Sequence, residues 1–407
     1  MFIQTPEPSD IAADGRYTRL EMIKTLNFEK IRHAKVMVIG AGAVGNEVIK
    51  NLALFGVGNI YIVDFDNIEK SNLTRAVLFR ERDTKKKSYK SIVAAKRANE
   101  INPDCNIIAR NADIVYDIGL GVFRQMDAVI CCIDSRFGRL MINRYCYWLN
   151  KSWINCGILD AEGICTVYKP GVNDYESELS DFAWKNIRFR LGCPDIARTF
   201  FEEGSTPTTP ISASIIGAVQ VSEALKIIHG YDEQLLAGFE FRFDLRKNEF
   251  FLTEGTEIKA DSESHKRMEY IQMTNLSSAS TISQLKDYIA RETDNINYEV
   301  VLRNPVVTKV QREIDGKTFK TLVKESGLAQ YLDKKKMRDC DSDHLHNRIF
   351  IKEKTTVLTA QTPLDKFSLK SIGVPDLDIL EVRTETKGTL YIELTADSSK
   401  YFNQSYD

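Results

Sequence analysis

The chain has few cysteines, no long apolar run and almost no net charge. Only 8 of its 407 residues are cysteine and no C-x-x-C pair occurs, so we expect no zinc site of the usual thiolate spacing. No stretch approaches the roughly 18 continuous apolar residues of a membrane span, and the N-terminal residues lack the apolar core of a signal peptide. We therefore expect a cytoplasmic protein with reduced thiols and no membrane partner.

The charge balance excludes a further class of partner. The 55 basic and 57 acidic residues leave a net charge of −2, so no overall positive field draws the protein to nucleic acid. Hydrophobic residues make up 43% of the chain and charged residues 28%, as in ordinary globular proteins. The length predicts two or three domains of roughly 150 residues each.

The first 250 residues alternate short β-branched runs with amphipathic segments of helical length. The runs that favour strands cover 35–40, 59–64, 106–110, 127–133 and 152–157. Alternating strands and helices predict an α/β fold, a doubly wound Rossmann-like domain whose sheet is mostly parallel. Because such sheets bind ligands beyond the carboxyl ends of their strands, we expect the site just after the runs that end near residues 40, 64 and 133.

Composition also suggests where the domains lie. We assign residues 1–252 to the first domain, in which 171–210 is a polar, irregular crossover segment. Residues 253–280 are poor in large apolar side chains and are expected to form a linker. Residues 281–407 mix one helical segment with alternating runs, which predicts a smaller α+β C-terminal domain.

A glycine-rich turn indicates a nucleotide site. Gly40, Gly42 and Gly45 form G-x-G-x-x-G directly after a predicted strand and before a predicted helix, with Ala43 in the same turn. Asp64 follows at the tip of the next strand. Glycines permit close backbone approach, the helix N-terminus offers free N–H groups to phosphate, and the carboxylate accepts hydrogen bonds from ribose hydroxyls.

The residues that follow favour ATP over a dinucleotide. Ser71, Asn72 and Arg75 lie within a dozen residues of the ribose carboxylate, and Lys90 begins the next predicted helix. A hydride-transferring enzyme does not need this cationic cluster, whereas a triphosphate does. Asp134 ends the fourth predicted strand, where a carboxylate can hold Mg²⁺.

In their order along the chain, the motifs RYTRL, GAGAVG, DFD, SNLTR, Lys90 and IDS resemble the adenylation domain of ubiquitin-activating enzymes and of the ThiF/MoeB adenylyltransferases. The resemblance covers about residues 16–230. It implies that the protein uses Mg·ATP to adenylate the C-terminal glycine carboxylate of a ubiquitin-like protein. It further implies that Asp64 holds the ribose, that Asp134 holds magnesium, that Arg19 is an arginine finger reaching the other subunit of a homodimer, and that the nucleotide also contacts Gly40, Gly42, Ala43, Gly45, Asp66, Ser71, Asn72, Arg75, Lys90 and Ser135.

Cys193 is the candidate acceptor for the activated acyl group. It lies on the expected crossover segment among three arginines, a setting that lowers the pKa of a thiol and makes it more nucleophilic. Related activating enzymes carry their thioester cysteine on such a crossover. The alternative is a structural or an incidental thiol.

The leading hypothesis is an activating enzyme that forms a thioester on Cys193 and passes the carrier to a conjugating enzyme. The resemblance extends to the stand-alone enzymes of bacterial ubiquitin-like conjugation operons, which suggests a role in antiviral defence. The C-terminal domain would then be ubiquitin-like and recruit the conjugating enzyme, although a carrier-docking surface or a dimerisation module fits its pattern equally well. The alternatives for the whole chain are a sulfur-carrier or peptide adenylyltransferase without an enzyme thioester, a non-catalytic binding module, and a nicotinamide oxidoreductase.

Overall fold

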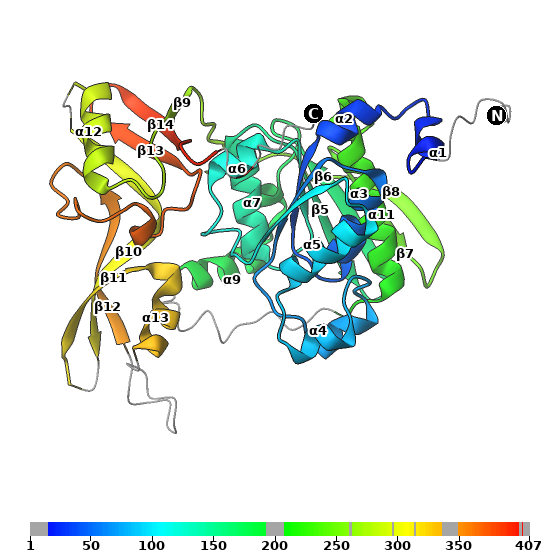
Figure 1. Ribbon diagram of the computed structural model, residues 1–407, viewed down its shortest axis with the longest axis horizontal. Helices are drawn as coiled ribbons and strands as arrows, with labels where there is room; N and C mark the ends of the chain where they lie inside the picture. The colour runs from blue at the N-terminus through cyan, green and yellow to red at the C-terminus, as the bar shows by residue number, and fades with distance from the viewer. Residues whose placement is uncertain are drawn as a thin grey trace.

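The computed structural model describes residues 15–192, 207–259, 263–294, 297–312, 315–335, 349–398 and 401. Within these ranges the chain forms one eight-stranded and one six-stranded sheet, which lie in separate lobes (Figure 1). Cys193, the candidate acceptor thiol, lies outside the described residues.

The first sheet has the strand order β3-β2-β1-β4-β5-β6-β7-β8. The strands from β3 to β5 are parallel, and those from β5 to β8 pair antiparallel. This is the predicted Rossmann-like α/β fold, and the strand order reverses between β1 and β4. The strands are β1 (Lys35–Ile39), β2 (Asn59–Val63), β3 (Asn106–Arg110), β4 (Ala128–Cys131), β5 (Trp153–Leu159), β6 (Glu162–Tyr168), β7 (Phe239–Asp244) and β8 (Glu249–Glu254).

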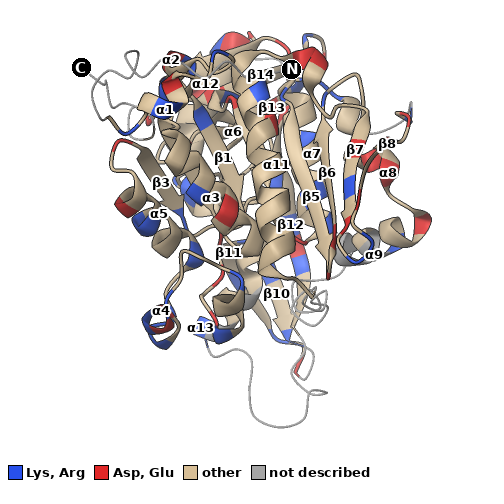
Figure 2. Ribbon diagram, turned by 90° about the vertical axis from the view of Figure 1, so that its right-hand side faces the viewer, with Lys and Arg blue, Asp and Glu red and all other residues tan. Residues whose placement is uncertain are grey.

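Helices cover both faces of this sheet. On one face α3, α5 and α11 enclose one apolar core, and on the other α6 and α7 enclose a second. Figure 2 shows α3 and α11 side by side across the strands. The helices of this lobe are α1 (Thr18–Glu21), α2 (Phe28–His33), α3 (Ala43–Phe55), α4 (Glu81–Lys85), α5 (Lys90–Ile101), α6 (Leu120–Gln125), α7 (Arg136–Trp148), α8 (Tyr175–Glu178), α9 (Asp181–Gly192) and α11 (Pro210–His229).

Helix α11 is long and apolar enough to cross a membrane by length and composition alone. Half of its most apolar window is buried, and the helix packs on α3 and on strands β4, β5 and β6. Thr209 caps its N-terminus and Gly230 ends it in the left-handed conformation. These contacts make α11 a core helix of the first lobe.

The crossover segment is more regular than its polar sequence predicts. Instead of an irregular chain, its described first part contains α8 and α9, and both helices contact α7. Asp174 caps α8 by accepting a hydrogen bond from the N–H of Ser177. Tyr175, Leu179, Ala183 and Ile187 bury their side chains in the core beneath α7, so a few well-spaced apolar residues suffice to order the segment.

The second lobe is a mixed sheet with the order β11-β10-β13-β14-β9, and β12 also pairs with β10. Helix α12 buries Ile282, Leu285 and Ile289 against this sheet. The expected linker 253–280 contains β9, which pairs in parallel with β14, so part of that segment belongs to the second sheet. The elements are β9 (Ile271–Thr274), α12 (Ile282–Glu292), β10 (Tyr298–Arg312), β11 (Thr318–Lys324), α13 (Leu328–Lys334), β12 (Ile349–Leu358), β13 (Ile379–Thr384) and β14 (Gly388–Leu394).

The two lobes dock through buried polar contacts and a shared core. Leu377, Ile379 and Tyr391 of the second lobe join the apolar core around α6 and α7. The guanidinium of Arg303 forms a two-point ion pair with Asp378, with Nη2–Oδ1 and Nε–Oδ2 distances of 2.7 and 3.2 Å. Asp378 accepts the N–H of Leu120, the first residue of α6, and Arg303 donates to the carbonyl oxygen of Ile118 just before it, which ties the second sheet to the first.

Candidate functional site

A cavity of about 520 Å³ lies at the carboxyl ends of β1, β2, β4 and β5. It occupies the point where the strand order reverses, which is where doubly wound sheets bind their ligands. Of the residues proposed from the sequence, the cavity brings together Gly40, Gly42, Ala43, Asp64, Asp66, Asn72, Arg75, Lys90, Asp134 and Ser135.

The glycine-rich turn brings backbone to the cavity wall. Gly40 has φ +93°, a conformation that side chains disfavour, and a Cβ there would lie 2.9 Å from the carbonyl oxygen of Cys132. Gly45 does not line the cavity, but a Cβ on it would lie 2.0 Å from the carbonyl oxygen of Gly40. Gly45 therefore permits the turn, and Gly42 caps α3 so that the first N–H groups of the helix face the cavity.

Asp64 is held by backbone donors. Its Oδ2 accepts the N–H of Ala41 at 2.7 Å, and its Oδ1 accepts the N–H of Asp66 at 2.8 Å. Burial raises the pKa of Asp64, while Lys90 and these two hydrogen bonds oppose that rise. Asp64 lines the cavity, where a carboxylate can accept hydrogen bonds from ribose hydroxyls.

Two cations approach the cavity from different elements. The Nη1 of Arg75 donates to the carbonyl oxygen of Ser71 at 2.9 Å, so Ser71 orients the guanidinium although it does not line the cavity itself. The Nζ of Lys90 lies 2.7 Å from Oδ2 of Asp66. A phosphate that binds Lys90 must therefore compete with Asp66 for the ammonium group.

The cavity lining is balanced in charge rather than uniformly positive. Asn72 contributes no charge, and its Oδ1 is occupied by the N–H of Glu69. The four basic side chains are Arg75, Lys90, Arg136 and Arg139, and the four carboxylates are Asp64, Asp66, Asp113 and Asp134. Neutralising a triphosphate here calls for a further cation.

Asp134 is suited to hold that cation. Among the residues that the structure describes, its carboxylate forms no hydrogen bond or ion pair with the protein. Ser135 follows it and caps α7 by accepting the N–H of Gly138, and the guanidinium of Arg139 donates to the carbonyl oxygen of Ile133 at 2.9 and 3.1 Å. The described ranges contain no group of three or more metal-ligating side chains. One carboxylate beside bound phosphates is the donor set that Mg²⁺ commonly uses.

Arg19 does not reach this cavity within its own chain. It is exposed on α1, whose position is fixed by Tyr17: the phenol O–H donates to Asp104 at 3.1 Å and accepts from Asn102 at 2.7 Å. Any contact between Arg19 and a nucleotide remains a prediction that requires a second subunit.

The sequence did not indicate several residues that line the cavity. Residues 113–115 follow β3, whose carboxyl end lies at the same sheet edge as those of β1 and β2. The parallel strand order could therefore have predicted that these residues line the cavity. No sequence pattern indicated that Phe137 and Thr208 line the cavity. Cys132 and Cys156 also line the wall, and a hydrogen bond from Cys132 is the main cause that lowers the pKa of the Cys156 thiol.

Comparison with known proteins agrees with this geometry. The sequence model of the ThiF family matches residues 15–267, more than half of the chain. A probable molybdopterin-synthase adenylyltransferase of Porphyra purpurea is 30% identical over 236 residues, which cover 56% of this chain and 57% of the relative. The NEDD8-activating enzyme E1 catalytic subunit of Caenorhabditis elegans is 42% identical over 117 residues, which cover 29% of this chain and 26% of the relative.

A solved structure shows the same fold. Escherichia coli MccB, crystallised with selenomethionine MccA, superimposes with a TM-score of 0.50 at 23% identity, covering 63% of this chain and 76% of that chain. The chain spans 57% of the length of the algal relative and about a quarter of the nematode one. On the family match over residues 15–267, the chain belongs to the ThiF family.

Proposed function

We propose that the protein binds Mg·ATP in this cavity and adenylates the C-terminal carboxylate of a ubiquitin-like protein. One observation carries the proposal: Arg75, Lys90 and Asp134 come from three separate elements and line a single cavity with the glycine-rich turn. Names of relatives such as SUMO-activating enzyme subunit 2 and NEDD8-activating enzyme support a ubiquitin-like substrate.

The chemistry follows from charge and position. A carboxylate is a poor acyl donor because its negative charge repels nucleophiles. Its oxygen attacks the α-phosphorus of ATP, a new O–P bond forms, and the bond to the β-phosphate oxygen breaks, so pyrophosphate leaves with the electron pair. Arg75 and Lys90 offset the charge of the phosphates, and the N-terminus of α3 donates N–H groups to them.

Magnesium, when bound at Asp134, supplies additional positive charge beside the phosphates. Asp64 positions the nucleotide through the ribose. The protein thus contributes binding, orientation and electrostatic stabilisation rather than a proton-transfer group.

The proposal continues with transfer to Cys193. The thiolate attacks the acyl carbon of the adenylate, a thioester forms, and AMP leaves; a conjugating enzyme recruited by the second lobe then accepts the acyl group. We further propose a homodimer in which Arg19 of each subunit reaches the nucleotide of the other. These steps rest on the resemblance to activating enzymes and on the reactive setting of Cys193 among arginines.

The experiment is ATP–pyrophosphate exchange with ubiquitin-like proteins that end in a free glycine carboxylate. We expect exchange that requires the free C-terminal carboxylate and is lost in Asp134→Ala, while the control Glu249→Ala on the exposed edge of β8 keeps the wild-type rate. Unchanged exchange in Asp134→Ala, with the fold verified by circular dichroism, would remove Asp134 from its role.

A second candidate function is adenylation alone, without a thioester on the enzyme. The match to a molybdopterin-synthase adenylyltransferase covers more of this chain than the matches to activating enzymes do, which favours a sulfur-carrier substrate without an enzyme thioester. The two functions differ in one product: a reductant-sensitive adduct of enzyme and carrier, absent in Cys193→Ala, requires the thioester route.

A further inference from the structure

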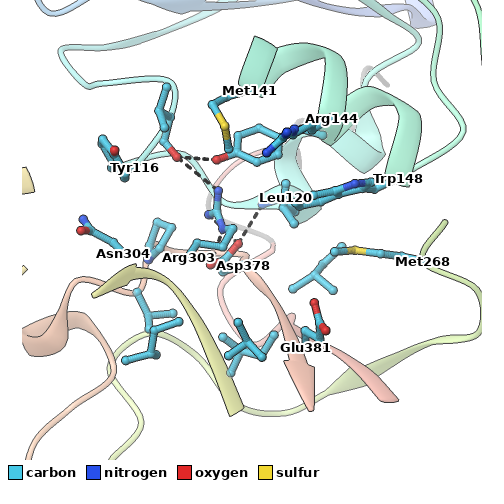
Figure 3. Close-up of a pocket in the computed structure, with 18 of the residues that line it drawn as sticks. Tyr116, Leu120, Met141, Arg144, Trp148, Met268, Arg303, Asn304, Asp378 and Glu381 are labelled. Carbon is cyan, nitrogen blue, oxygen red and sulfur yellow. Dashed lines mark hydrogen bonds and ion pairs between the residues drawn. The ribbon is translucent and has the colours of Figure 1, made fainter. Parts of the chain in front are cut away.

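A second cavity lies between the two lobes. It measures about 630 Å³ and separates α6 and α7 of the first lobe from β10 and β13 of the second. Figure 3 shows Met141 and Trp148 of α7 on one side, with Arg303 and Asp378 on the other. We call this cavity the interdomain groove.

The interdomain groove adjoins the nucleotide cavity. Val115 and Phe137 line both cavities, and Phe137 lies on the first turn of α7, three residues after Asp134. The carbonyl oxygen of Val115 accepts hydrogen bonds from Tyr145 at 2.8 Å and from Arg303 at 3.4 Å. The second lobe thus fixes the wall that the two cavities share.

The lining suits a polypeptide that ends in a carboxylate. Aromatic and flexible apolar side chains, Phe137, Met141, Trp148 and Met268, provide the surface on which peptide side chains pack. Four basic residues and two carboxylates line the groove, and Glu176 pairs with one of the four, so the lining keeps a small positive charge that favours passage of an anionic chain end. The basic residues are Arg144, Lys266, Arg303 and Arg383, and the carboxylates are Asp378 and Glu381.

The polar groups of the lining are held in place. Arg144 pairs with Glu176 at 2.9 Å, Lys266 pairs with Glu381 at 2.6 Å, and Arg303 pairs with Asp378 at 2.7 Å. Paired side chains keep their positions when a ligand enters, so the groove is pre-formed. Such a groove binds an extended chain at a lower cost in conformational entropy.

We propose that the interdomain groove binds the extended C-terminal tail of the polypeptide whose carboxylate is adenylated. The tail packs between α7 and β10, passes Val115 and Phe137, and presents its terminal carboxylate beside Asp134. This inference rests on the proposed function, and it makes the second lobe one wall of the acyl-substrate site.

The test uses a defined probe. A pool of synthetic ten-residue peptides with randomised upstream positions, a C-terminal Gly-Gly and a diazirine side chain four residues from the end is incubated with the full chain and Mg·ATP. After irradiation, mass spectrometry maps the cross-links, and pyrophosphate exchange is measured with the same pool. We expect cross-links at Met141, Trp148 and Met268 that disappear when the peptide ends in an amide.

Groove-filling variants give a second measurement. We expect Met141→Trp and Met268→Trp to raise the KM for the peptide pool at least tenfold while the Kd for ATP stays within twofold of wild type. The matched control is Leu252→Trp, which places the same side chain on the exposed strand β8 and should change neither value. An unchanged peptide KM in both groove-filling variants would overturn the inference.

The outcomes separate the two proposals. Exchange without cross-links in the groove overturns the present inference and leaves the proposed function intact. Cross-links in the groove without exchange overturn adenylation and retain a peptide-binding groove. The absence of both overturns both.

Discussion

The ion pair between Arg303 and Asp378 should dominate the docking of the two lobes. The side chain of Asp378 is 4% exposed and that of Arg303 is 15% exposed, so both charges lie largely out of water. Asp378 also accepts the N–H of Leu120 at 3.0 Å. Asp378→Ala would leave the guanidinium of Arg303 buried without its partner, which typically costs about 3–5 kcal/mol.

Burial alone would lower the pKa of Arg303, and the charge of Asp378 more than offsets this effect. Asp378→Ala removes that offset, but the ordinary pKa of an arginine lies so far above neutral pH that the guanidinium remains charged in the variant. Loss of a proton therefore does not relieve the free-energy cost of the unpaired charge, and this cost weakens the contact between the lobes.

Amide hydrogen exchange can measure this penalty directly. The N–H of Gly121 donates to the carbonyl oxygen of Leu377 at 2.8 Å, so its exchange reports opening of the contact between the lobes. A loss of about 3 kcal/mol corresponds to roughly hundredfold faster exchange, since about 1.36 kcal/mol is a factor of ten. Exchange within tenfold of wild type in Asp378→Ala would refute the reasoning.

The control is a carboxylate whose ion pair is exposed. Asp294 lies 2.8 Å from Lys387 in the second lobe, with 80% of its side chain exposed. Because solvent screens such pairs, Asp294→Ala should leave the exchange of Gly121 unchanged.

Three further predictions concern the first lobe. Lys90→Ala should weaken ATP binding at least tenfold, because the bound phosphates and Asp66 lose the ammonium group of Lys90. The melting temperature should not change, and calorimetry measures both quantities. Gly40→Ala should lower the free energy of unfolding by about 2 kcal/mol or more in urea titrations, since its φ is positive and the new Cβ meets backbone. Burial raises the pKa of Glu178 to about 7, so its folded form holds a proton that the unfolded form releases near pH 4.5. Stability should therefore fall by up to about 3 kcal/mol as pH rises from 4.5 to 7, and Glu178→Gln should abolish that fall; an identical pH profile of urea unfolding in the variant would contradict it.

The first sheet was predictable because its signals are local. β-branched runs, a G-x-G-x-x-G turn and an acidic residue at the next strand end fix where β1, α3 and Asp64 lie. The parallel order then places Lys90 and Asp134 at one edge, although they are 44 positions apart in the sequence.

Other parts of the site depend on contacts that sequence patterns do not encode. The pairing of Lys90 with Asp66 arises only when α5 meets the loop after β2. Strand β9 is four residues long and lies in a polar stretch, so its residues have a weak intrinsic propensity for a strand. It forms because it pairs with β14. The interdomain groove could not be foreseen, because its two walls lie more than 100 residues apart along the chain.

The segment from Asp113 to Gly121, which ends in the first turn of α6, contacts both the nucleotide cavity and the second lobe. Its first residues form a wall of the nucleotide cavity, and its last residues carry the hydrogen bonds to Leu377 and Asp378. ATP binding and docking of the second lobe are then linked thermodynamically. If ATP raises the equilibrium constant for docking by some factor, docking raises the affinity for ATP by the same factor. One short stretch of backbone is thus the direct connection between the nucleotide cavity and the second lobe.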